Sequence, residues 1–452
     1  MKVSKARSLA LEVLNRVSDE GAYANLLLPK LLKKANLDER DAAFAQELAF
    51  STIRWQLTYD EIINKVSTRP SGSMDRILLN CLRLGAHQLL QMRVPAHAAI
   101  SETVELVRQQ CGEKVVGFSN GVLRAISKHD LNFWSHEISD GINETKRLSV
   151  QYSHPEWIVT ALKQALVADS IPEQLELLLQ VNNQPAAVNL VALPGLAERE
   201  EFASNSLPDR FSPYGFSIKS GNPAELRGFS EGRIRVQDEG SQIVALAMLG
   251  ARTAAANETW LDMCAGPGGK AALLAALAKQ VQAKLIANEP QKHRADLVRD
   301  ALLPFTSNSR VTEHDGREMG KIMPNTFDRI LVDAPCSGLG ALRRRPEARW
   351  RKSNEDLKDL TALQFALIES AYQALKPGGL LLYATCSPHL SETTAVVNKT
   401  LRQLDLEVLD LTKVLNDKYF NGELPSSRKT VQLHTQRDNT DSMFMALLTK
   451  PL

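Results

Sequence analysis

The stretch TWLDMCAGPGGKAALLAALAKQ, residues 259–280, decides the fold class of this chain of 452 residues. Its first part, 259–263, is apolar and predicts a buried strand, and its alanine-rich part, 269–280, predicts a helix. The glycine-rich turn 264–270 joins the two. Glycines let a ligand approach the backbone closely, and the start of the helix offers unpaired N–H groups. The stretch is therefore typical of the first unit of a doubly wound parallel sheet.

The alternation of strand and helix continues after this stretch. Further strands are predicted at 283–288, 310–312, 328–333 and 379–384, and further helices at 291–302, 355–375 and 391–403. Repeated units of this length indicate an α/β fold with a mostly parallel sheet, which binds its ligands at the carboxyl ends of the strands.

Four regions are predicted along the chain. Residues 1–130 show apolar positions at helical spacing and predict an all-α bundle, and 131–152, where the periodicity weakens, is interpreted as a linker. A small α+β segment follows at 153–231, with helices near 156–168 and 173–181 and strands near 187–191 and 216–218. Residues 232–452 form the α/β domain.

Composition narrows the class of protein. Lys and Arg number 54 and Asp and Glu 52, so the net charge of +2 gives little support for a nucleic-acid partner. No apolar run approaches the roughly 18 residues that a membrane span needs. The five cysteines form no CxxC pair, so we expect a reduced, cytosolic protein without a metal site. They are Cys81, Cys111, Cys264, Cys336 and Cys386.

One segment, 343–352, is strongly basic. It holds six positive residues and one negative residue, with Trp350 among them. Such a segment either contacts RNA phosphates beside a stacking platform or forms a solvated loop, and charge alone leaves both open. The candidate RNA-binding residues are Arg343, Arg344, Arg345, Arg349, Arg351 and Lys352.

The glycine-rich turn 264–270 differs from two familiar nucleotide-binding motifs. A P-loop needs glycine six positions before its lysine and a hydroxyl after it, but here Cys264 precedes Lys270 and Ala271 follows it. The spacing GxGxxG is also absent. Acids follow three successive strands, at Glu289, Asp315 and Asp333. Each alone is more often a helix cap or a solvated residue, but together they favour a cofactor that contains a nucleoside.

Two cysteines follow predicted strands. Cys336 comes after 329–332 and Cys386 after 379–382. Because parallel strands end at one edge of the sheet, we expect both thiols there, with Asp333 three residues before Cys336. Two thiols and a carboxylate at a ligand-binding edge indicate covalent nucleophilic chemistry, for which a thiol with a pKa of about 8.5 must be activated.

These motifs resemble those of the RNA cytosine-C5 methyltransferases of the RsmB (Sun/Fmu) family. The similarity rests on 264–270, on Asp333-Ala334-Pro335-Cys336-Ser337-Gly338 with the following Arg343-Arg344, on Thr385-Cys386-Ser387 and on the lead-in segment 236–242. The N-terminal helices resemble the NusB-type RNA-binding fold. The resemblance implies a Rossmann-like class I methyltransferase domain with a seven-stranded sheet. It also implies a cytosine of 16S rRNA, cytosine 967, as the target.

The resemblance also implies roles for single residues. S-adenosylmethionine would be bound by Cys264, Ala265, Gly266, Pro267, Gly268, Gly269 and Lys270, together with Glu289, Asp315 and Asp333. Cys386 would be the nucleophile that adds to C6 of the base. Cys336 would assist product release, and Asp333 would contact the target base. DNA cytosine methyltransferases use the Pro-Cys thiol as nucleophile, so Cys336 stays open as an alternative.

The chain departs from the family pattern after Cys386, where only Glu392 remains of an acidic stretch, and in the glycine-rich turn at Gly266 and Ala271. Residues 440–444 resemble the family's closing strand, with Asp441 either in a ligand role or in a plain hairpin turn. Two other functions stay open: the same chemistry on transfer RNA, and a non-catalytic RNA-binding assembly or antitermination factor.

Overall fold

The computed structural model describes residues 3–425 and 427–452, and the chain divides into two compact units. The first, the helical unit, comprises Met1–Pro185 and the separate segment Leu342–Lys352. The second, the sheet unit, comprises Ala186–Ala341 and Ser353–Leu452. The chain therefore leaves the sheet unit for eleven residues and returns to it.

Amphipathic helices form the helical unit. Five of them begin where the side chain of Ser4, Asp38, Asp75, Asp130 or Asn143 accepts a backbone N–H of the first turn. The apolar faces of the helices between residues 5 and 152 form one core. The helices are α1 (Lys5–Asp19), α2 (Ala24–Ala35), α3 (Glu39–Arg54), α4 (Gln56–Val66), α5 (Arg76–Leu90), α6 (Ala96–Cys111), α7 (Val116–Ile126), α8 (Leu131–Glu137), α9 (Glu144–Tyr152), α10 (Glu156–Ala168), α11 (Leu175–Asn182) and α17 (Ala348–Arg351).

The segment 131–152, predicted as a linker, is instead part of this unit. It contains α8 and α9, and Trp134, Ile138 and Val150 belong to the helical core. Both helices are short, at 7 and 9 residues, so too few turns repeat for the apolar period to stand out in the sequence.

A small antiparallel sheet begins the sheet unit. Its strands are β1 (Asn189–Ala192), β2 (Ser206–Pro208), β3 (Gly215–Ile218) and β4 (Ile234–Val236), in the order β2-β3-β1-β4. Because β4 pairs with β1, the predicted boundary at 231/232 cuts through this sheet. The helices predicted near 156–168 and 173–181 lie in the helical unit, so the segment 153–231 is divided between the two units.

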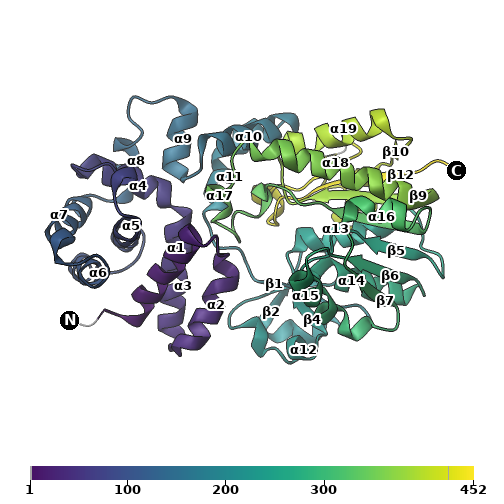
Figure 1. The fold of residues 1–452 in the computed structure, drawn as a ribbon, viewed down its shortest axis with the longest axis horizontal. Helices are drawn as coiled ribbons and strands as arrows, with labels where there is room; N and C mark the ends of the chain where they lie inside the picture. The colour runs from purple at the N-terminus through teal and green to yellow at the C-terminus, as the bar shows by residue number, and fades with distance from the viewer. Residues whose placement is uncertain (1–2, 426) are drawn as a thin grey trace. The chain divides into compact units, whose positions relative to one another are not determined.

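The large sheet has the order β10-β12-β9-β8-β5-β6-β7, and β11 pairs with β12 as an eighth strand. In the part β9-β8-β5-β6-β7 of the sheet, all neighbouring strands are parallel, whereas β12 is antiparallel to β9 and to β10. This arrangement confirms the mostly parallel sheet with helices on both faces (Figure 1). The strands are β5 (Thr259–Asp262), β6 (Lys284–Asn288), β7 (Ser309–Thr312), β8 (Phe327–Asp333), β9 (Leu375–Thr385), β10 (Glu407–Val408), β11 (Val431–Gln432) and β12 (Phe444–Thr449).

The pleat of the sheet divides its side chains between two cores. In β5, Trp260 packs in the core with α13, α14 and α15, whereas Leu261 packs in the core with α16, α18 and α19. Both faces are thus covered, which explains why the strands read as continuous apolar runs. The helices of this unit are α12 (Arg227–Ser230), α13 (Glu239–Gly250), α14 (Gly269–Gln280), α15 (Lys292–Leu302), α16 (Met319–Ile322), α18 (Asp356–Ala374), α19 (Thr394–Gln403), α20 (Leu411–Leu415) and α21 (Thr435–Asp438).

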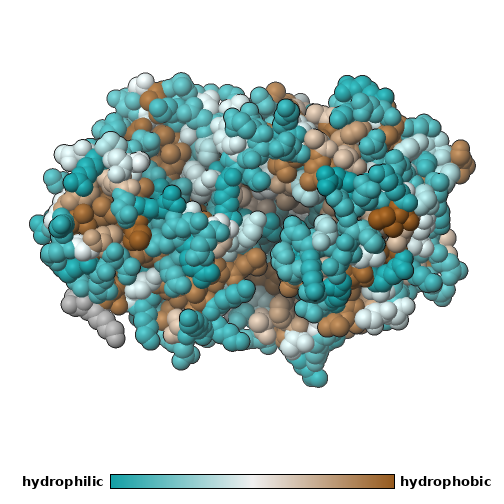
Figure 2. All heavy atoms as spheres, viewed as in Figure 1, coloured by the Kyte–Doolittle hydropathy of each residue, from teal (hydrophilic) through white to brown (hydrophobic). Residues whose placement is uncertain are grey.

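Hydrophilic side chains cover most of the face shown in Figure 2, and hydrophobic residues there form scattered groups. Among the described residues, no helix is long and apolar enough to span a membrane.

The basic segment 343–352 is built into the helical unit. The guanidinium of Arg349 is fully buried and donates hydrogen bonds to the carbonyl oxygens of Arg54, Ser153 and Asn182 and to the side-chain oxygen of Asn183, at 2.6–3.2 Å. This position corrects the sequence interpretation: Arg349 satisfies backbone carbonyls and is not available to phosphates.

The other members of the segment differ in exposure. Arg343 is also buried, and Arg351 donates to the carbonyl oxygen of Ala22. Arg345 is exposed, and Arg344 and Lys352 are half-buried. RNA contact by Arg344, Arg345, Arg351 and Lys352 stays a prediction.

Candidate active site

The glycine-rich turn connects β5 to α14 at the carboxyl edge of the large sheet. Gly268 has φ +108° and lies against Ala301, where a Cβ would come within 2.6 Å of its neighbour, so only glycine fits. A Cβ on Gly266 would collide with the carboxylate of Glu289 and with the guanidinium of Arg294. No side chain caps the start of α14. The turn is therefore packed closely against its neighbours, and the first N–H groups of α14 have no side-chain cap.

Asp262, the last residue of β5, is a site residue that the sequence interpretation missed. Its side chain is 1% exposed, and neither carboxylate oxygen has a hydrogen-bond partner of normal geometry among the described residues. Burial, with the nearby carboxylate of Asp333, raises the pKa of Asp262 to about 7. An acid ending a buried strand before a glycine-rich turn was the available signal.

Two of the three predicted acids lie with this group. Glu289 is buried, accepts the N–H of Gln291 at 3.1 Å and lies 3.4 Å from the guanidinium of Arg294. Asp333 ends β8 and pairs with Lys270. Asp315 is different: its carboxylate accepts the N–H of Arg317, and the side chains of the two residues form an exposed ion pair. Asp315 therefore acts as a helix cap, and a contact between Asp315 and a cofactor stays a prediction.

Lys270 links the turn to the catalytic candidates. Its Nζ lies 2.9 Å from Asp333 Oδ2 and 3.2 Å from Ser241 Oγ. Burial by itself would lower the pKa of Lys270, but the Asp333 carboxylate and the sulfur of Cys386 outweigh it and raise that pKa. The lysine is thus a half-buried ammonium that pairs with a carboxylate and lies near a thiol. Its partner Ser241, on α13, was not predicted as a site residue.

The two cysteines meet as the sequence predicts. Cys336 Sγ and Cys386 Sγ are 3.4 Å apart, on the loops that follow β8 and β9. The hydrogen bond to Cys386 raises the pKa of Cys336 well above its usual value, and burial and the negative charge of Glu392 act in the same direction. Cys336 therefore keeps its proton, while Lys270 places a positive charge near Cys386. The electrostatic environments of the two thiols therefore differ.

Two further loops hold the cysteine loops in place. The N–H of Gly340 donates to the carbonyl oxygen of Cys386 at 2.9 Å, and the carbonyl oxygen of Gly340 accepts the N–H of Ser442 at 2.9 Å. The N–H of Asp441 in turn donates to Asp238 at 3.0 Å. The connection between β11 and β12 thus reaches the site through its backbone. Asp441 lies in this connection, and a ligand role for it stays a prediction.

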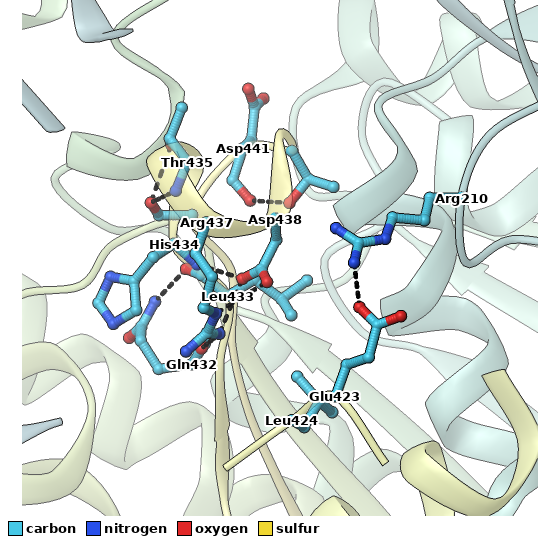
Figure 3. Close-up of polar contacts among 12 residues, drawn as sticks. Arg210, Glu423, Leu424, Gln432, Leu433, His434, Thr435, Arg437, Asp438 and Asp441 are labelled. Carbon is cyan, nitrogen blue, oxygen red and sulfur yellow. Dashed lines mark hydrogen bonds and ion pairs between the residues drawn. The ribbon is translucent and has the colours of Figure 1, made fainter. Parts of the chain in front are cut away.

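Side-chain contacts fix the shape of this connection (Figure 3). The Asp438 carboxylate accepts the N–H of His434 at 2.7 Å and pairs with Arg437 at 2.8 Å, and the hydroxyls of Thr435 and Ser442 lie 3.0 Å apart. Figure 3 shows the Asp441 carboxylate pointing away from the Asp438 group.

Comparison with known proteins shows the family of the chain. Residues 251–449 match the family model described as 16S rRNA methyltransferase RsmB/F, and residues 4–128 match the NusB family model. The chain is 42% identical to a methyltransferase of Mycobacterium tuberculosis, over 98% of this chain and 96% of that protein. It is 30% identical to ribosomal RNA small subunit methyltransferase B of Erwinia tasmaniensis, over 99% of each.

Solved structures share the fold. The structure titled PH0851 covers 99% of this chain and all of that one with a TM-score of 0.81 at 22% identity. A methyltransferase homologue from Pyrococcus horikoshii covers 68% of this chain and all of that one with a TM-score of 0.56 at 21% identity. The fold is that of a class I methyltransferase. The chain belongs to the RsmB/F family of 16S rRNA methyltransferases and carries a NusB-like helical domain.

Proposed function

We propose that the protein transfers a methyl group from S-adenosylmethionine to C5 of a cytosine in 16S rRNA, cytosine 967 by resemblance to its family. The observation that carries the proposal is the pair of thiols 3.4 Å apart beside the Lys270–Asp333 ion pair, at the carboxyl edge of a parallel sheet.

The residues around the glycine-rich turn fit the cofactor. The start of α14, after the turn 264–270, has no side-chain cap and offers backbone N–H groups, and the buried Asp262 carboxylate can accept a hydrogen bond or face a positive charge. Glu289 lies at the end of β6, where a carboxylate can bind ribose hydroxyls. When bound, S-adenosylmethionine supplies an electrophilic methyl group on a positively charged sulfur.

The chain's own groups would activate the base. C5 of cytosine is a weak nucleophile, and addition of the Cys386 thiolate to C6 would turn C5 into an enamine carbon. C5 could then attack the methyl group of the cofactor as the methyl–sulfur bond breaks and its electron pair goes to the sulfur, which leaves as a neutral thioether. The C6–S bond forms as the C5–C6 double-bond electrons move into the ring. Asp333 would contact the base near N3, where a proton relieves the developing negative charge, and the Lys270 ammonium would hold a proton beside it.

Product release reverses the addition. A base removes the proton from C5, the C5–C6 double bond re-forms, and the C6–S bond breaks to return Cys386 as a thiolate. Because Cys336 keeps its proton and lies 3.4 Å away, its S–H can stabilise the departing thiolate. The target base must be unstacked or flipped for the thiolate to reach the face of C6.

Two variants test the assignment of the thiols. Cys386→Ala should abolish methyl transfer from radiolabelled S-adenosylmethionine, and Cys336→Ala should accumulate an RNA–protein adduct that survives denaturing electrophoresis. Cys111→Ser, a thiol change on α6 of the helical unit, is the matched control and should behave like the wild type. If Cys386→Ala turns over at the wild-type rate, the assignment of Cys386 as the nucleophile is wrong. If an adduct forms in Cys386→Ala but not in Cys336→Ala, the two cysteines have the opposite roles.

The substrate is tested separately. Bisulfite sequencing of ribosomal and transfer RNA from cells lacking the protein should show one 16S rRNA cytosine losing its mark. A loss confined to transfer RNA, or no loss at all, would refute the proposed substrate.

A further inference from the structure

Glu392 is a buried carboxylate that joins the two cysteine loops. It is fully buried in the turn after β9, and its Oε1 accepts the backbone N–H of Ser337 at 2.8 Å. Its Oε2 accepts the hydroxyls of Ser337 at 2.5 Å and Ser387 at 2.7 Å. Ser337 directly follows Cys336 and Ser387 directly follows Cys386. One carboxylate therefore fixes the residues next to both thiols.

Neighbouring groups hold the carboxylate itself. The Gln364 side chain, from α18, donates to Glu392 Oε1 at 3.1 Å and to the carbonyl oxygen of Pro335 at 2.9 Å. The hydroxyl of Tyr383, in β9, donates to the carbonyl oxygen of Glu392 at 2.6 Å. Gln364 and Tyr383 are both fully buried. Gln364 and Tyr383 belong to a helix and a strand of the sheet unit, so regular elements hold both the carboxylate and the backbone of Glu392.

We propose that Glu392 is a positioning residue that sets the separation between Cys336 and Cys386, and through it the release of the methylated base. The proposal rests on the proposed function for its catalytic consequence, but the separation of the thiols does not depend on that function. A buried carboxylate with four donors is a rigid anchor, because loss of the carboxylate leaves buried donors unpaired.

The hydrogen-bond pattern predicts which substitutions this anchor tolerates. At Oε1 both partners can only donate, so glutamine must place its carbonyl oxygen there. At Oε2 both partners are hydroxyls, which can accept from the two N–H bonds of a glutamine amide. Glu392→Gln should therefore keep the loops together, whereas Glu392→Ala should release them.

The first measurement needs neither RNA nor cofactor. The full-length protein is treated with diamide, which takes two hydrogens from a pair of thiols to form a disulfide and is itself reduced to a hydrazine. Peptide mass spectrometry follows the Cys336–Cys386 bond. We expect wild type and Glu392→Gln to oxidise at similar rates and Glu392→Ala to be slower by about tenfold or more, because the thiols lose their proximity.

The second measurement is turnover on RNA. Glu392→Ala should lose methyl transfer by an amount on the order of 100-fold. It should also leave a larger share of the protein as an RNA adduct, while Glu392→Gln stays within a few-fold of wild type. The control is Ser370→Ala on α18, which removes a buried hydroxyl that bonds Gly316 and Gly320 and touches neither cysteine loop. It should change neither oxidation nor adduct level.

Each result decides one question. Wild-type oxidation of the thiol pair in Glu392→Ala would overturn the proposal, and so would Glu392→Gln failing as badly as Glu392→Ala. If Glu392→Ala does not fold, Ser387→Ala, which removes one of the four bonds, takes its place and should slow oxidation in the same direction. If the wild-type protein neither methylates RNA nor forms an adduct, the proposed function fails while the oxidation rates still decide the role of Glu392.

Discussion

Asp262→Asn is the change for which the structure gives the clearest magnitude. The carboxyl group is buried, its pKa is raised from 3.8 to about 7, and asparagine has the same shape without the charge. Below pH 3.8 both the folded and the unfolded chain hold the proton. Between pH 3.8 and about 7 only the folded chain holds it, so the unfolding free energy falls by about 1.4 kcal/mol for each pH unit. Above pH 7 the buried Asp262 is ionised, and its ionisation lowers the unfolding free energy by the full amount, about 4 kcal/mol.

The assay is urea unfolding of the protein without cofactor, followed by circular dichroism at pH 5 and pH 8. Asp262→Asn escapes the cost of the buried charge, so its stability advantage over wild type should be larger at pH 8 by about 3 kcal/mol. Asp296→Asn, which removes a carboxylate from the exposed side of α15, is the control and should show no such change. An advantage that is equal at the two pH values, or a wild type that gains on the variant as pH rises, would refute the reasoning.

The same variant should lose function as it gains stability. If the Asp262 carboxylate faces the positively charged cofactor, Asp262→Asn should bind S-adenosylmethionine about tenfold more weakly, or about 1.4 kcal/mol, by calorimetry at pH 8. Unchanged affinity would place the carboxylate outside the cofactor site.

Three further changes test other parts of the molecule. Lys270→Gln removes the positive charge beside Asp333, and methyl transfer should fall by an amount on the order of 100-fold in a radiolabel assay. Gly266→Ala places a methyl group against the Glu289 carboxylate, and equilibrium dialysis should show cofactor affinity reduced by about tenfold or more. Arg349→Met leaves four buried acceptors without their donor, and urea unfolding should show the helical unit destabilised by about 3 kcal/mol or more.

Each of these changes has a matched control. Lys376→Gln removes the partly exposed Lys376–Asp328 ion pair, and methyl transfer should be retained. Gly117→Ala adds a methyl group in α7 where nothing lies within 4 Å, and cofactor affinity should not change. Arg345→Ala removes an exposed arginine of the same basic segment and should leave stability within about 0.5 kcal/mol of wild type. An effect of Lys270→Gln, Gly266→Ala or Arg349→Met no larger than that of its control contradicts the prediction.

Local sequence was sufficient to predict the helix and strands from which the candidate site is built. The helix predicted at 269–280 is α14 as observed, and the strand predicted at 328–333 differs from β8 by one residue. Apolar runs bounded by glycine and proline define these elements without help from tertiary contacts. The meeting of Cys336 and Cys386 followed from the same information, because parallel neighbours end at one edge.

Contacts between distant residues could not be predicted in the same way. The basic segment 343–352 reads as a surface feature, but the carbonyl acceptors that bury Arg349 come from helices more than 100 residues away in the chain. Asp262 was assigned to a strand and given no role, since its raised pKa arises from burial and from Asp333, which lies on another strand. The strand β4 has only three residues, which is too short for a recognisable alternation, so the sequence could not show that it belongs with the strands before the predicted boundary at 231/232.

The difference between the two thiols also comes from such distant contacts. As a sequence, each cysteine follows a buried strand and precedes a serine, and only the resemblance of Pro335-Cys336 and Thr385-Cys386 to family motifs assigns them different roles. In the folded chain the hydrogen bond to Cys386, burial and the Glu392 carboxylate raise the pKa of Cys336, whereas the Lys270 ammonium lies near Cys386. A negative charge near Cys336 disfavours its thiolate. The different surroundings of the two thiols thus come from Glu392 and Lys270, which the fold brings to them, and the proposed roles of nucleophile and release group use this difference.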